Sequence, residues 1–126
     1  MNKNMIGWFE IPVTDMERAK TFYETVFQIE IQIHDFGEAV MGWFPSADGK
    51  PGSSGSLIQK PEWYIPNFKE GVLIYFSSDD VQNELNSITA AGGRILKQKT
   101  LISPDIGYMA LFHDSEGNRI ALHSKK

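Results

Sequence analysis

The sequence predicts an α+β fold built from two βαβββ modules, and three observations support this. Apolar and polar residues alternate in several short segments, which is typical of strands with one buried face. Two longer segments carry apolar residues at helical spacing. The two halves also match: an offset of 65 residues pairs the two predicted helices, and an offset of 68 pairs Met41–Phe44 with Met109–Phe112. Such a repeat indicates a duplicated unit.

The first module is predicted over about residues 5–60. It begins with a strand at Ile6–Val13, followed directly by a helix. Thr14 and Glu17 have the spacing of a capping box, in which the two side chains bond to free amides of the first helical turn. The apolar face of this helix comprises Met16, Ala19, Phe22, Tyr23, Val26 and Phe27. Three further strands are predicted at Ile29–His34, Ala39–Phe44 and Ser56–Gln59.

The second module, over about residues 71–126, repeats this order. Its first strand is Val72–Phe76, and its helix carries an apolar stripe from Val81 to Ala91, which Gly92 and Gly93 terminate because glycine tolerates a left-handed cap. The remaining strands are Arg94–Thr100, Gly107–His113 and Asn118–Ser124. The whole chain, residues 1–126, is therefore expected to form a single domain.

A connecting arm of about residues 61–70 separates the modules. It carries Trp63 and Tyr64 between two prolines, with Phe68 shortly after the second, and it shows neither strand nor helix periodicity. Three interpretations are open: a lid over a cleft, a contact in a dimer, or aromatic anchors for a long loop. The anchor interpretation is favoured, although interfaces are also enriched in these residues.

Composition excludes several classes of protein. With 126 residues, 41% of them hydrophobic, the chain is long enough to bury a core. The absence of cysteine excludes disulfides and thiolate metal sites. A net charge of −4 without a basic stripe argues against nucleic-acid binding, because neutralising phosphates supplies most of that affinity.

Membrane association is not expected either. The longest uncharged stretches, such as Ala39–Ala47, fall far short of the roughly 20 apolar residues that span a bilayer. The first ten residues lack the apolar centre of a signal peptide. We therefore expect a cytoplasmic location.

The motifs of the chain resemble those of the vicinal oxygen chelate superfamily, which includes glyoxalase I, bleomycin and fosfomycin resistance proteins and extradiol dioxygenases. The resemblance covers nearly the whole chain, and it rests on Phe9–Asp15 running into Arg18–Tyr23, on Ala90–Gly93 ending the second helix, and on Phe112–Leu122. It implies eight strands in an open, curled mixed sheet around a cleft, with the helices outside. It also implies a homodimer.

In that superfamily a divalent metal is held by side chains from both modules, so that two substrate oxygens can chelate it. The resemblance places the four ligand positions of this chain on Trp8, on or near Ser56, on Val72 or Leu73, and on Ala121. None of these side chains is a strong donor for a divalent ion. We therefore expect no metal site and no cofactor. A site made by His34 with Glu30 is disfavoured, because these side chains lie too far apart along a strand.

Strand alternation indicates which other side chains face the cleft. If Trp8 points into the cleft, so does Glu10. In the same way, Tyr75 points to the same face as Leu73, and His123 to the same face as Ala121. The candidate ligand-binding set is thus Trp8, Glu10, Tyr75 and His123, and the last three are also candidate acids or bases. The alternative is structural: a core tryptophan, a solvated glutamate and an exposed histidine.

Three functions are compatible with these residues. The first is a metal-free small-molecule-binding module, similar to the drug-sequestering resistance proteins, with an aromatic cleft. The second is a lyase or dioxygenase-type enzyme that uses a noncanonical metal site or the acid–base chemistry of Glu10, Tyr75 and His123. The third is a homodimeric regulatory or structural protein. Loss of the four ligand positions favours the first over the second. The third explains the same loss, so the sequence does not choose between the first and the third, and fold membership alone does not establish function.

Overall fold

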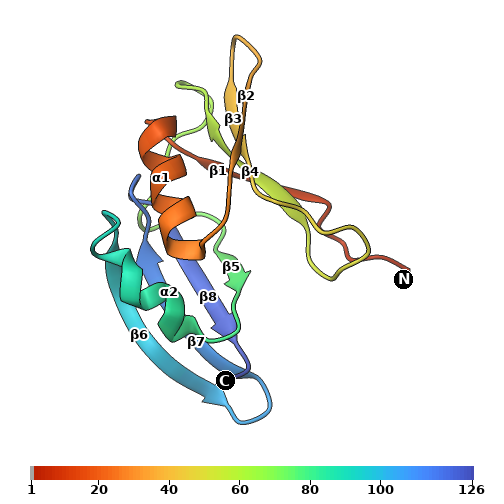
Figure 1. Ribbon diagram of the computed structural model, residues 1–126, viewed down its shortest axis with the longest axis vertical. Coiled ribbons are helices and arrows are strands. Elements are labelled where there is room, and N and C mark those ends of the chain that lie inside the picture. Colours follow the sequence, from red (N-terminus) through yellow and green to blue (C-terminus); the bar gives the residue numbers. More distant parts are fainter. Residues whose placement is uncertain (1) are drawn as a thin grey trace.

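The computed structural model describes residues 2–126 and contains eight strands and two helices (Figure 1). The strands form two mixed four-stranded sheets of order β1-β4-β3-β2 and β5-β8-β7-β6. The predicted α+β fold is confirmed, with the eight strands divided equally between two open sheets. The elements are β1 (Trp8–Pro12), α1 (Met16–Phe27), β2 (Gln32–Asp35), β3 (Val40–Trp43), β4 (Ser54–Gln59), β5 (Ile74–Ser77), α2 (Val81–Ile88), β6 (Arg94–Ser103), β7 (Gly107–His113) and β8 (Arg119–Ser124).

Strand register confirms the internal duplication. In the first sheet Glu10 lies opposite Ser56, and in the second Tyr75 lies opposite Ala121. Both members of the second pair are offset by 65 residues from the first, so the parallel pairs β1–β4 and β5–β8 have the same register. Both helices also begin after an aspartate cap, Asp15 in α1 and Asp80 in α2.

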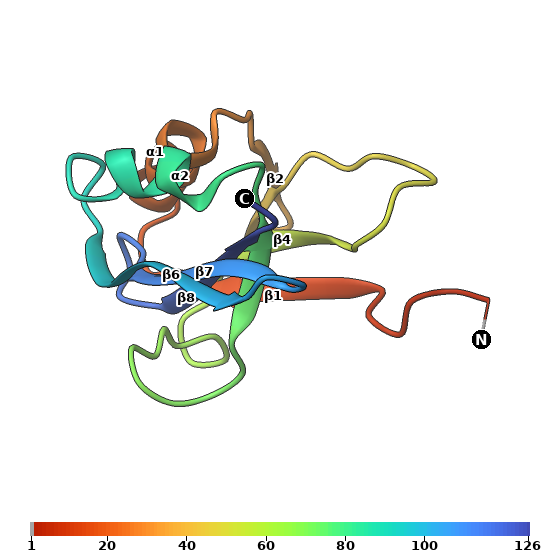
Figure 2. The same cartoon turned by 90° about the horizontal axis from the view of Figure 1, so that it is seen from below.

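The two helices contact each other and lie on one side of the sheets, whereas the segment that links β4 to β5 runs on the other side (Figure 2). Helix α1 buries most of its predicted apolar face, including Phe22 and Tyr23. Helix α2 is shorter than predicted: it ends at Ile88, and Gly92 has a φ of +104° in the turn that follows. Among the described residues, no helix has the length and apolar character needed to cross a membrane.

An aromatic cluster between the modules packs against the buried core. Phe76 of β5 lies 5.8 Å from Phe9 of β1, 4.8 Å from Phe27 of α1 and 5.4 Å from Phe44 after β3, measured between ring centroids. Gly55 in β4 makes room for this cluster, since a Cβ there would lie 2.3 Å from the Phe9 ring. Packed aromatic side chains therefore contribute to the contact between the modules.

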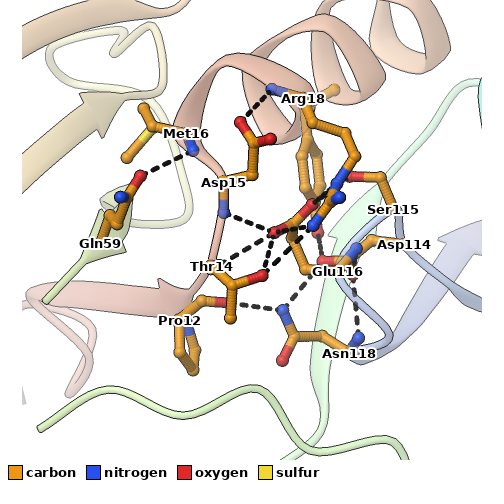
Figure 3. A network of polar contacts seen from close by, with 11 residues as sticks. Pro12, Thr14, Asp15, Met16, Arg18, Gln59, Asp114, Ser115, Glu116 and Asn118 are labelled. Atoms are coloured by element: carbon orange, nitrogen blue, oxygen red, sulfur yellow. Dashed lines mark hydrogen bonds and ion pairs between the residues drawn. The ribbon is translucent and has the colours of Figure 1, made fainter. Parts of the chain in front are cut away.

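The start of α1 is capped by a residue of the other module (Figure 3). The Glu116 carboxylate accepts hydrogen bonds from the backbone amides of Thr14 and Asp15, at 2.9 and 2.8 Å, and from the Thr14 hydroxyl at 2.9 Å. It also pairs with Arg18 at 2.7 Å. The predicted capping box of Thr14 and Glu17 is therefore wrong: Asp15 is the N-cap, and Glu116 supplies the second carboxylate.

Asp114 forms a buried polar network beside this contact. Its carboxylate accepts from the Tyr23 hydroxyl at 2.6 Å, and from the backbone amides of Glu116 and Asn118 at 2.9 and 2.8 Å. The Asn118 side chain donates to Asp114 at 3.0 Å and to the Pro12 carbonyl at 2.7 Å. The β7–β8 turn is thus tied to both β1 and α1.

Candidate functional site

The first sheet presents one face away from α1, which we call the open face. Alternation places its side chains opposite to Phe9, Ile11 and Leu57, which belong to the core. Register aligns them across the sheet: Glu10 and Trp43 both lie opposite Ser56. The open face comprises Trp8, Glu10, Pro12, Gln32, His34, Met41, Trp43, Ser54, Ser56 and Ile58.

Three aromatic rings form a continuous surface on the open face. The rings of Trp8 and Trp43 meet edge to face, with centroids 6.1 Å apart. The His34 ring lies over Trp43, with centroids 3.8 Å apart and an angle of 32° between the planes. Trp8 remains 43% exposed. Surfaces of this kind suit a flat ligand, because aromatic rings offer both apolar area and stacking geometry.

The same face carries buried polar atoms without partners. The atoms are His34 Nε2, Trp43 Nε1 and Ser56 Oγ, and none of them hydrogen-bonds within residues 2–126. Buried polar groups are nearly always paired, because an unpaired one costs about 1–3 kcal/mol. The hydrogen-bonding capacity of these three atoms is therefore not used by any residue of the described chain.

Glu10 is covered by the connecting arm. The Tyr64 hydroxyl donates to its carboxylate at 2.7 Å, and this hydrogen bond raises the pKa of Tyr64. The arm is also held at Asn67. The backbone amide of Asn67 donates to Asn118 Oδ1 at 3.2 Å, and its backbone carbonyl accepts from the Arg119 backbone amide at 3.3 Å. Tyr64 and Asn67 thus anchor the arm, whereas Trp63 is 75% exposed.

Tyr75 and His123 lie on the second sheet. Tyr75 is opposite Ala121, and His123 is opposite both Ser77 and Met109. The Tyr75 side chain is 51% exposed. The His123 ring is already engaged, because its Nε2 lies 2.7 Å from the carbonyl oxygen of Ile106.

The four predicted site residues therefore form two pairs on two sheets. Trp8 and Glu10 share the open face, but Trp8 lines a hollow of about 750 Å³ whereas Glu10 lines a smaller one of about 250 Å³ under the arm. Tyr75 lines a third hollow, of about 700 Å³, between the modules. The hollow at Trp8 is also lined by Trp43, Glu30, Gln32, Ser46 and Ser54.

Four residues of this site were not among the sequence candidates: Trp43, Ser56, His34 and Tyr64. Alternation along β3 places Trp43 on the same side as Met41, but only the β3–β4 register brings its ring beside Trp8. The sequence points to Ser56 and His34 only as possible metal ligands. No local pattern links Tyr64 to Glu10, since the two residues are far apart in sequence.

The positions at which the resemblance expects metal ligands do not fit a metal. The equal register of the two modules makes Leu73, rather than Val72, the counterpart of Trp8. Trp8 lies two residues before Glu10, the strand partner of Ser56, and Leu73 lies two residues before Tyr75, the strand partner of Ala121. An indole, a hydroxyl, an isobutyl and a methyl group make no site for a divalent ion. Among residues 2–126, no three His, Asp or Glu side chains cluster in a way that would hold a metal ion.

Comparison with known proteins agrees with this architecture. A protein from Didymella fabae described as a glyoxylase-like domain-containing protein is 32% identical over 120 residues, covering 93% of this chain and 91% of its own. Glyoxalase I from Zea mays has a similar fold, with a TM-score of 0.74 at 19% identity over 94% of this chain, which spans only 45% of the maize protein. TnmS3, an antibiotic binding protein from Streptomyces sp. CB03234, gives a TM-score of 0.66 at 22% identity, with 100% of this chain and 99% of its own covered.

The family model named Glyoxalase/Bleomycin resistance protein/Dioxygenase superfamily matches residues 5–122. That match takes in both modules, the arm and every residue of the open face. The protein therefore belongs to the glyoxalase/bleomycin resistance protein/dioxygenase superfamily.

Proposed function

We propose that this protein is a small-molecule-binding module that holds a flat, largely apolar ligand on the open face of its first sheet without a metal ion. The observation that carries the proposal is the contact of three aromatic rings, Trp8, Trp43 and His34, beside buried polar atoms that have no partner. The rings supply apolar contact area, and the free donors and acceptors orient the bound molecule.

The surroundings of the open face support binding rather than metal-assisted catalysis. The hollow at Trp8 measures about 750 Å³, which lies within the range of small-molecule sites. The four expected ligand positions lack the donors that would activate a substrate oxygen through a metal. One structural neighbour, TnmS3, is described as an antibiotic binding protein, which gives a precedent for binding on this fold.

Replacing Trp8 with alanine is expected to weaken binding of planar aromatic compounds by at least tenfold while the protein stays folded. The indole is 43% exposed, so its loss removes ligand contact area and little of the core. Calorimetric titration with naphthalene sulfonate and with proflavine, one anionic and one cationic, measures the effect for either ligand charge. Addition of EDTA should change neither affinity.

Trp63→Ala is the matched control, because this tryptophan is 75% exposed on the arm, outside the open face. It should leave both affinities unchanged. Equal affinity in the wild-type protein and the Trp8→Ala variant would show that the ligand binds elsewhere, and loss of binding in EDTA would show that a metal takes part.

We further propose that two copies of the chain associate. Both β1 and β5 are edge strands, so each leaves backbone groups on one side without a strand partner within the described chain. Large apolar side chains are also exposed near β5 and in the β6–β7 hairpin, including Val72 at 87%, Leu101 at 50% and Ile106 at 50%. A second copy would cover such surfaces.

Light scattering at tens of micromolar protein is expected to give twice the 14.2 kDa mass of one chain. Association by apolar burial should persist when the salt concentration is raised, because salt screens charge pairs but not apolar contacts. A mass equal to that of one chain at this concentration would contradict the dimer.

A further inference from the structure

The hollow that Tyr75 lines is a cavity between the modules, on the side of the first sheet that faces the helices. Its volume is about 700 Å³. One wall is apolar and comes from Phe27 at the end of α1, Phe44 after β3 and Phe76 of β5, and Ile29 extends it. Trp8, Trp43 and the other open-face residues do not line it, although the two hollows meet at Ile29, Phe44 and Pro45.

The other wall of this cavity is acidic. Glu84, in the first turn of α2, lines it together with Asp79, and no basic side chain is among the described residues that form its walls. The Oε1 atom of Glu84 is buried and has no hydrogen-bond partner within residues 2–126. Burial is the main reason that the pKa of Glu84 is raised, and it outweighs the opposing effects of the Ser78 side chain and the Glu84 backbone amide.

Glu84 is not needed to start helix α2. Asp80 is the N-cap and accepts from the Gln82 amide at 3.0 Å. Asp80 also pairs with Lys99 at 2.9 Å, so the helix start already carries a carboxylate with a charged partner. A buried carboxylate oxygen without a partner costs stability and is retained most readily where a ligand supplies the missing donor.

We propose that this cavity binds a small molecule with an apolar, aromatic body and a protonated amine, the body packing on Phe27, Phe44 and Phe76 and the amine donating a charge-assisted hydrogen bond to Glu84. The acidic wall favours a cation, and the phenylalanine wall excludes small hydrated ions. This site is separate from the open face, so one can be occupied without the other.

A matched pair of probes tests the proposal: naphthylmethylamine, which is cationic at neutral pH, and naphthylmethanol, its neutral counterpart. Isothermal titration of the wild-type protein is expected to show at least tenfold tighter binding of the amine. Glu84→Gln should abolish that preference, leaving the two probes with similar affinities. Its melting temperature should equal or exceed that of the wild-type protein, because the substitution removes a desolvated charge.

Glu17→Gln is the control variant, since Glu17 occupies the first turn of α1 and is exposed. It should keep the full preference for the amine, and so should Trp8→Ala, whose effect is confined to the open face. Equal affinities of the two probes in the wild-type protein, absence of binding by both, or a preference that persists in Glu84→Gln would each overturn the proposal.

Discussion

Asp114→Ala is expected to lower the free energy of unfolding by about 3–5 kcal/mol, the largest loss from a single polar substitution in this fold. The residue is only 3% exposed, and its carboxylate accepts four hydrogen bonds. Alanine would leave the buried Tyr23 hydroxyl and the Asn118 side chain short of an acceptor. Each buried donor left without an acceptor costs about 1–3 kcal/mol. Urea unfolding at neutral pH, followed by fluorescence, measures the loss.

Two further variants separate the network from general effects of substitution. Tyr23→Phe removes one donor and leaves the Asp114 carboxylate with its other partners, so we expect a smaller loss of about 1–2 kcal/mol. Asp105→Ala changes an exposed aspartate in the β6–β7 turn and should stay within about 0.5 kcal/mol of the wild-type protein. If Asp114→Ala destabilised no more than Asp105→Ala, the network would not hold the β7–β8 turn.

Sequence patterns predicted the elements of this fold well, because those patterns are local. The spacing of Met16, Phe22 and Val26 on one helical face is an immediate consequence of the helical period, and all three side chains are buried. The repeat at 65 residues reappeared as equal strand register in the two modules. Boundaries were less accurate: α2 was predicted to run to Ala91 but ends at Ile88, where Thr89 follows as the cap.

The candidate site was predicted only in part, for a physical reason. Alternation assigns a side chain to a face of its own strand, so Trp8 and Glu10 were correctly placed together. It does not determine how one sheet lies relative to the other, and Tyr75 and His123 lie on a different sheet. Neighbours across strands depend on register, which is why Trp43 was missed. Whether any of these residues binds a ligand stays a prediction.

The start of α1 illustrates the same limit at smaller scale. A carboxylate at the spacing of Glu17 is a common capping partner, and the local pattern alone favours it. In the folded chain the β7–β8 turn brings Glu116 to the same amides, where it gains Arg18 as a charged partner as well. Glu116 takes the place of Glu17 because it accepts hydrogen bonds from two amides, a hydroxyl and a guanidinium, whereas Glu17 would accept a single local bond.

The contacts of Glu116 with the start of α1 lead to the second large expected effect, a pH-dependent loss of stability in Glu116→Gln. Hydrogen bonds from Arg18, Asp15 and Thr14 outweigh burial and lower the pKa of Glu116 from 4.5 to about 2. A lowered pKa means that the folded state binds this proton less readily than the unfolded state. The stabilisation is therefore complete above pH 4.5 and is lost as the pH falls towards 2. Allowing for partial screening by solvent, we expect a contribution of about 2 kcal/mol.

The wild-type protein and Glu116→Gln should therefore differ by about 2 kcal/mol near neutral pH and converge near pH 2, as measured by urea unfolding across that range. Burial raises the pKa of the neighbouring Asp114, but that group is present in both proteins, so most of its own titration cancels in the difference. Asp48→Asn, in the turn that the internal repeat matches with the Glu116 turn, is exposed and should show no such convergence. Strong salt should shrink the neutral-pH difference, because the Arg18 side chain is 53% exposed. A difference that stays constant from neutral pH down to pH 2 would mean that the shape of Glu116, and not its charge, joins the modules.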